Sequence, residues 1–194
     1  MSEPQIHYLL EKIMRGDQKA FESLYNSFYE DIYRFVRYFL SESDAQEVVS
    51  DVFFKVWCNR DKLGYVTNFR SYLYTIARNE SYNYLRLLKR IQNIPLDELP
   101  VSLTINEECV EGLLIEKEMI EVYNQAVEEL PERCKLIFLM VREEKLKHKD
   151  IAEILSITTG TIEQQMNIAI RKISDTVRTH YPQLLVSNDK LKIG

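Results

Sequence analysis

Apolar residues recur at intervals of three and four along most of the chain, the spacing that gathers them on one face of an α-helix. The pattern is clearest over residues 6–13, 20–39 and 45–57. No run of alternating apolar and polar residues is bounded by the turn residues that are typical of a β-hairpin. The sequence therefore predicts an all-α fold.

Glycine and proline mark the ends of these helical stretches and do not interrupt them. Gly16 follows the first stretch, and Asp17 then has the place of an N-cap for a long helix. Residues 41–44, SESD, have the composition of a turn and cap before the next helix. Pro131 opens a later helix in the first turn, where proline is tolerated.

The composition changes sharply in the middle of the chain. The run 92–109 contains two prolines and no helical period, and it is longer than ordinary loops between helices of one domain. We predict two small helical domains, residues 1–91 and 116–182, joined by a flexible linker over residues 92–115. A tail over residues 183–194 shows no strong pattern.

Residues 148–173 have the rhythm of a helix-turn-helix, in which a short helix, a tight turn and a second helix follow one another. Many helical hairpins share this rhythm, so it is compatible with DNA binding without requiring it. The apolar residues that we expect to face inward are Ile151, Ala152, Leu155, Ile157, Ile162, Met166, Ala169 and Ile170.

Positive charge is concentrated in residues 69–90 of a chain whose formal net charge is −5. The segment has five basic residues and one acid, Glu80, which on a helix projects away from the basic side. Basic side chains can follow a nucleic-acid backbone, while tyrosine, asparagine and arginine can stack on bases or bond to them. A basic solvent-facing helix is the alternative. We expect Phe69, Leu73, Ala77, Tyr84, Leu87 and Leu88 on the packed side, and Arg78, Asn79, Tyr82, Asn83, Arg86 and Arg90 as candidate contacts on the other side.

A second stripe lies on the predicted helix over residues 44–57. Glu47, Ser50, Asp51 and Phe54 follow one another at helical spacing on a side that the apolar face does not need. An exposed phenylalanine among acids indicates a surface for a partner helix. The alternative is that Phe54 packs under a neighbouring loop.

The sequence lacks the pattern of a catalytic or metal site. The three histidines are isolated, and the three cysteines lie far apart without a C-x-x-C pair. Phosphate-binding glycine loops and nucleophile elbows do not occur. We therefore expect no enzyme activity, no cofactor and no metal. Without a signal peptide or an apolar run of membrane-spanning length, a cytoplasmic location is expected.

Three stretches together carry a family resemblance. They are DAQEVVSDVFFKVW (44–57), FRSYLYTIARNESYNYLR (69–86) and LPERCKLIFLMVREEKLKHKDIAEILSITTGTIEQQMNIAIRKI (130–173). In this order and at this spacing they resemble bacterial RNA polymerase sigma factors of the extracytoplasmic-function type. The resemblance places a polymerase-clamp and −10 domain over roughly residues 15–91 and a −35 domain over roughly residues 116–178.

The resemblance implies a sigma factor that binds core RNA polymerase and directs promoter recognition, −10 melting and transcription initiation. The −10 contacts would be the candidates named above, with Asn79 and Asn83 facing bases and the arginines holding phosphates. The loop 61–69 would help to hold an extruded base, at a cost of a few kcal/mol repaid by contacts in the pocket. The implied polymerase-binding residues are Glu47, Ser50, Asp51 and Phe54, although the family more often has glutamine at position 50.

For the −35 element the resemblance implies contacts from Thr159, Thr161, Gln164, Gln165, Arg171 and Lys172. Family members commonly have basic residues at several of these early positions, so we expect this domain to hold DNA weakly. A domain that packs against a partner and barely reads DNA is the alternative. Ser156 stands where the turn usually has glycine. If that position needs a positive φ, serine costs roughly 1–2 kcal/mol there.

The implied partners are core RNA polymerase, promoter DNA and an anti-sigma factor, whether membrane-anchored or not, and no small-molecule substrate. Two other functions fit the residues by themselves. One is a helix-turn-helix transcription regulator that works without polymerase. The other is a helical interaction adaptor whose basic helix binds an acidic protein.

Overall fold

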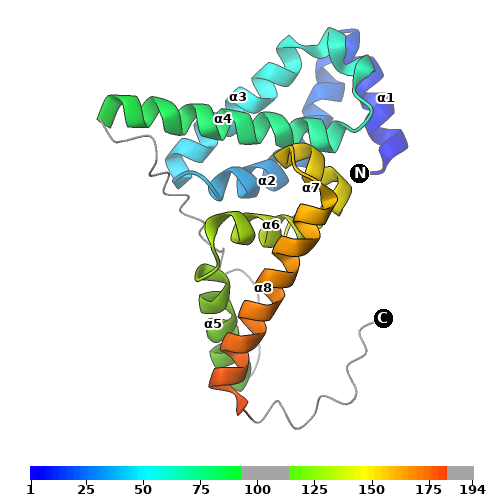
Figure 1. Ribbon diagram of the computed structural model, residues 1–194. Coiled ribbons are helices and arrows are strands. Elements are labelled where there is room, and N and C mark those ends of the chain that lie inside the picture. The colour runs from blue at the N-terminus through cyan, green and yellow to red at the C-terminus, as the bar shows by residue number, and fades with distance from the viewer. Residues whose placement is uncertain (93–113, 183–194) are drawn as a thin grey trace.

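A computed structural model describes residues 1–92 and 114–182, and within these ranges all regular structure is helical (Figure 1). The predicted all-α fold is therefore confirmed. Most of the predicted linker and the predicted tail lie outside the described residues. No helix in the described ranges is long and apolar enough to cross a membrane. The helices are α1 (Glu3–Met14), α2 (Gln18–Arg37), α3 (Glu42–Cys58), the 3-10 helix η1 (Arg60–Tyr65), α4 (Phe69–Gln92), α5 (Leu114–Glu128), α6 (Glu132–Arg142), α7 (His148–Leu155) and α8 (Thr159–His180).

The helices up to α4 form the first domain around an aromatic core. Asp17 is the N-cap of helix α2, as the sequence predicts, and its side chain accepts hydrogen bonds from the backbone N–H groups of the first turn. Phe35 lies at the centre, its ring centroid 4.9 Å from that of Tyr74 on α4 and 5.3 Å from that of Phe39. These edge-on contacts are the arrangement that aromatic rings favour, and they tie α4 to α2.

A tyrosine at the middle of α4 fixes this helix against the start of α3. The Tyr84 hydroxyl donates to Oδ1 of Asp44 at 2.8 Å. This hydrogen bond, together with burial, raises the pKa of Tyr84 to about 12, so the hydroxyl stays a donor at neutral pH. The contact sets which side of α4 faces outward.

The packed side of α4 is shorter than the helical period predicts. Phe69, Leu73 and Ala77 are buried, but Leu87 is 56% exposed, so its predicted place on the packed side is wrong. Figure 1 shows the reason: the end of α4 projects beyond α2 and α3, so neither of these helices covers it. Leu85, which the helical period had not placed in the core, is buried.

Helices α5 to α8 form the second domain. Both α5 and α6 pack against α8, and α7 lies at the start of α8, as the helix-turn-helix rhythm predicts (Figure 1). Ile162, Met166 and Ala169 are buried as expected, whereas Ile170 is 45% exposed and its predicted inward position is wrong. Ala169 and Ile173 already fill the seam, and a residue one position from Ala169 is turned about 100° away from it.

The turn between α7 and α8 places serine in a left-handed backbone conformation. Ser156 has φ 55° and ψ 47°, and the N–H of Ile157 donates to the carbonyl of Ala152 at 3.0 Å, closing the end of α7. We expect Ser156→Gly to raise the free energy of unfolding by about 1 kcal/mol, because glycine has no Cβ to clash in this conformation. Urea denaturation followed by circular dichroism measures the change.

Ser23→Gly is the matched control for this prediction. Ser23 is exposed inside α2, so glycine should lower the free energy of unfolding there by about 0.5 kcal/mol. If both variants lose stability alike, the turn is not strained by Ser156.

The two domains touch each other, which the helical pattern does not predict. Helix α7 packs against α4, and Glu144, in the turn that follows α6, bonds to residues of α2 and α4. The open surface of α4 is therefore bounded on one side by the second domain.

Candidate functional site

Helix α4 presents an open face that combines amide and basic side chains. Asn79, Asn83 and Arg86 are all exposed. The acid of this segment, Glu80, turns toward α3 and forms an ion pair with Lys55 at 2.5 Å, where its side chain is 15% exposed. Glu80 also accepts a long contact of 3.5 Å from Asn83 Nδ2. Because Lys55 balances Glu80, the open face of α4 keeps the positive character that its sequence predicts.

Two of the predicted contacts on this face are partly committed to packing. Tyr82 is half-buried, with its ring centroid 5.5 Å from that of Phe39, so one side of the ring belongs to the core. Arg78 is half-buried as well. Its Nε and Nη2 donate to Oδ1 of Asn79 at 3.2 and 2.9 Å, and its Nη1 donates to the carbonyl of Ile154 in α7. Arg90 belongs to α4, but its side chain lies outside the described ones.

The segment before α4 presents an aromatic side chain that the sequence reasoning did not single out. Tyr65, at the end of η1, is 88% exposed. An exposed ring beside Gly64, in a segment expected to hold an unstacked base, was the available signal, since tyrosine can stack on a base. Asn68 ends this segment and caps α4, accepting a hydrogen bond from the N–H of Ser71 at 3.1 Å.

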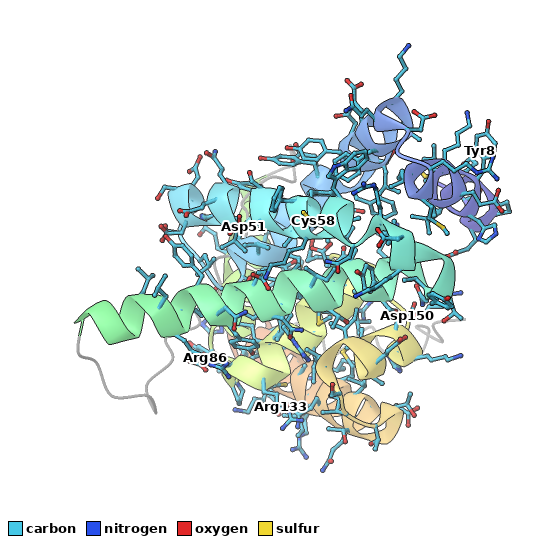
Figure 2. The ribbon with its side chains drawn as sticks, turned by 90° about the horizontal axis from the view of Figure 1, so that it is seen from above. Tyr8, Asp51, Cys58, Arg86, Arg133 and Asp150 are labelled. Carbon is cyan, nitrogen blue, oxygen red and sulfur yellow. The ribbon has the colours of Figure 1, made fainter. Side chains whose placement is uncertain are left out.

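The acidic stripe on α3 is a free surface. Glu47, Ser50 and Asp51 are exposed, and Phe54 is 65% exposed, so the alternative that Phe54 packs under a loop is wrong. In Figure 2, Asp51 and Arg86 lie on opposite sides of α4. The first domain thus separates an acidic surface with an exposed ring from a basic surface with amides.

Helix α8 presents a mainly uncharged face near its start. Thr159, Gln164, Arg171 and Lys172 are exposed, whereas Thr161 and Gln165 are half-buried. The hydroxyl of Thr158 caps the helix by accepting from the N–H of Thr161 at 3.1 Å. The six predicted residues therefore differ in how far they reach outward.

A thiol contact holds α6 against α8. Sγ of Cys134 donates to the carbonyl of Gln165 at 3.3 Å. Burial raises the pKa of the Cys134 thiol, although the positive charge of Lys172 opposes the shift. The thiol therefore stays protonated and remains a donor at neutral pH.

Comparison with known proteins matches both domains. The family model described as Sigma-70 region 2 matches residues 24–91, and the one described as Sigma-70, region 4 matches residues 120–173. The chain is 25% identical to the ECF RNA polymerase sigma-E factor of Escherichia coli K12 over 177 residues, which cover 88% of this chain and 93% of the relative. The corresponding factor of Haemophilus influenzae is 24% identical over the same length, covering 88% of this chain and 94% of the relative.

Two solved structures share the fold. The structure of CnrH in complex with the cytosolic domain of CnrY superposes with a TM-score of 0.63 at 18% identity, covering 90% of this chain and 98% of CnrH. The sigma factor RpoE of Bartonella quintana, in complex with the anti-sigma factor NepR, superposes with a TM-score of 0.59 at 19% identity, covering 82% of this chain and 98% of RpoE.

The two family matches cover well over half of the chain, in the order of regions 2 and 4, and the full-length relatives are sigma factors. The chain therefore belongs to the sigma-70 family, in the extracytoplasmic-function group, whose members bind core RNA polymerase and direct it to promoters.

Proposed function

We propose that the two domains divide promoter recognition between them. Residues 1–91 dock on core polymerase and bind the −10 element, residues 116–182 bind the −35 element, and residues 92–115 link them. The observation that carries this proposal is the separation of the two exposed surfaces of the first domain. A basic and amide-rich face on α4 suits DNA, while an acidic stripe with an exposed ring on α3 suits a basic protein partner.

The open face of α4 and the segment before it would bind the −10 element as it melts. Asn79 and Asn83 can pair with base edges, and Arg86 can hold a phosphate. Tyr65 can stack on an extruded base, because its ring is almost wholly exposed. These contacts would offset the cost of unstacking the promoter bases.

The chain would act as a binding factor in the cytoplasm, without catalytic turnover of its own. The polymerase would catalyse RNA synthesis, and this chain would contribute binding contacts to the polymerase and to promoter DNA. CnrH and the Bartonella RpoE are held in complexes with CnrY and with an anti-sigma factor. We extend this to the present chain and propose an anti-sigma factor as a third partner beside polymerase and promoter DNA.

The −35 contacts from α8 would depend on amides more than on charge. Glutamine pairs best with adenine in the major groove, and Gln164 is exposed near the start of the helix. We expect Gln164→Ala and Gln165→Ala to lower the preference for an adenine-containing −35 site, with each lost contact costing about 1–3 kcal/mol. Run-off transcription with core polymerase on a promoter library measures this preference.

Two further variants accompany this measurement, with DNA binding followed at several salt concentrations. Gln165→Lys should strengthen DNA binding and steepen its salt slope by about one unit, because it adds one phosphate contact. Gln125→Ala on α5 lies outside α8 and should change nothing. Absence of any promoter-dependent transcript would refute the proposed function as a whole. Output indifferent to the −35 sequence, in the wild type and both alanine variants, would refute the role of α8 alone.

A further inference from the structure

Within the described residues, a buried carboxylate of the second domain is bound by side chains of the first. The Glu144 side chain is 0% exposed. Its Oε1 accepts from Nε of Arg34 at 3.1 Å and from the Tyr38 hydroxyl at 2.9 Å, and its Oε2 accepts from the Tyr74 hydroxyl at 2.8 Å and from Nη2 of Arg34 at 3.4 Å. An ion removed from water needs this many donors, since burial of an unpaired carboxylate is costly.

The local backbone directs Glu144 out of its own domain. Helix α6 ends at Arg142, and Lys145, which follows Glu144, has a left-handed φ of 52°. The N–H of Leu146 then donates to the carbonyl of Met140 at 3.1 Å, which closes the turn. The turn is thereby shaped so that the carboxylate projects toward α2 and α4.

The donors also have contacts within the first domain. Nη2 of Arg34 also bonds to Asp31 at 2.9 Å, which orients the guanidinium. Tyr38 and Tyr74 are both buried, with exposed fractions of 4% and 0%. Burial and the neighbouring Glu144 charge raise the pKa of both tyrosines, so each hydroxyl stays protonated and donates a hydrogen bond. One carboxylate therefore meets three fixed donor groups.

A second contact lies on the surface proposed for the −10 element. Nη1 of Arg78 donates to the carbonyl of Ile154, and Nδ2 of Asn68 donates to Oδ1 of Asp150 at 2.9 Å. Both acceptors belong to α7, which packs along the first half of α4. While α7 occupies this position, Nη1 of Arg78 and Nδ2 of Asn68 are bound within the chain and are not available to DNA.

We infer that this sigma factor closes on itself, with residues 144–155 of the second domain seated on α2 and α4 of the first. The Glu144 carboxylate is the latch of this closed form, and α7 covers part of the −10 surface. The second half of the inference rests on the proposed function of α4. Closing reduces the apparent affinity for single-stranded −10 DNA by the fraction of molecules that are open. Weakening the latch therefore increases binding without touching the DNA contacts.

The test compares Glu144→Gln with the wild type in the full chain. Glutamine keeps the shape but removes the charge, and hydrogen bonds to a charged group are strong enough that the open population should rise about tenfold. Small-angle X-ray scattering should give a larger radius of gyration for the variant. Fluorescence anisotropy with a short non-template −10 strand, taken from a transcribed promoter, should show affinity higher by up to the same factor. Glu143→Gln, an exposed neighbour, is the control and should match the wild type.

A second variant guards against loss of folding. Tyr38→Phe removes one hydroxyl donor and keeps the ring that packs on Phe35, so it should open the chain in the same direction by a smaller factor. Scattering from both variants identical to the wild type would overturn the latch. A larger radius of gyration without any gain in DNA affinity would overturn the inference that α7 covers part of the −10 surface. The rest of the proposed function would be unaffected.

Discussion

Asp51→Arg is expected to abolish binding to core RNA polymerase while the chain stays folded. Asp51 is exposed on α3, between Glu47 and Phe54 on the same stripe. An acidic stripe fits a basic partner surface, and placing a like charge against that partner costs several kcal/mol. Because the side chain lies in solvent, the substitution should change the free energy of unfolding by no more than about 0.5 kcal/mol. A pull-down on core polymerase measures binding, and circular dichroism measures folding.

A double substitution removes the apolar contact together with a second acid of the stripe. Phe54→Ala together with Glu47→Ala should also remove core binding, because an exposed ring at the centre of an interface is a typical hot spot. Glu11→Arg on α1 makes the same charge change away from the stripe and should bind like the wild type. Retention of core binding by the stripe variants would exclude α3 as the docking surface. Unfolding of the Phe54 variant would instead mean that this ring is buried in solution.

Asn79→Ala and Asn83→Ala are expected to change the base preference in the −10 element. Both amides are exposed on the open face of α4, and a lost base contact costs about 1–3 kcal/mol, or roughly fivefold to more than a hundredfold in discrimination. Arg86→Ala should weaken opening of all promoters alike, because an arginine on this face meets phosphate. Transcription from promoters with every −10 substitution measures both effects.

Asn26→Ala on α2 is the matched control, since it removes an exposed amide away from α4. The two asparagines of α4 should also differ from each other. Among the described residues, Asn79 accepts two hydrogen bonds from Arg78, whereas Asn83 makes a long contact with Glu80, so Asn83 is the less engaged of the two in the closed form. Unchanged −10 selectivity in both variants would remove the base-reading role from this face.

The sequence by itself determined the helices and much of their exposed sides. Asp17 caps α2, and Pro131 precedes α6 as its N-cap, one residue before the first turn in which it was expected, because capping and proline geometry are properties of a few neighbouring residues. The exposure of Phe54 was one of the two alternatives that the sequence left open, and the structure decides for it. The apolar positions of α3 already form a complete face, so a further phenylalanine on another side has no core to enter. The family resemblance, confirmed by both family matches, also came from local stretches in a given order.

Only the tertiary structure decided where the neighbouring helices end and which domain a side chain meets. Leu87 is exposed because the end of α4 extends beyond α2 and α3. The apolar period of one helix does not predict where the neighbouring helices end. Arg78 stands in the basic strip by sequence, yet part of its guanidinium is bound by α7. Glu144 lies in a charged run that is typical of an exposed segment. It is buried because hydrogen-bond donors 70 to 110 residues away in the sequence bind its carboxylate. These hydrogen bonds form only when the two domains pack together. A local sequence pattern cannot predict them, because it contains no information on residues that are distant in the chain.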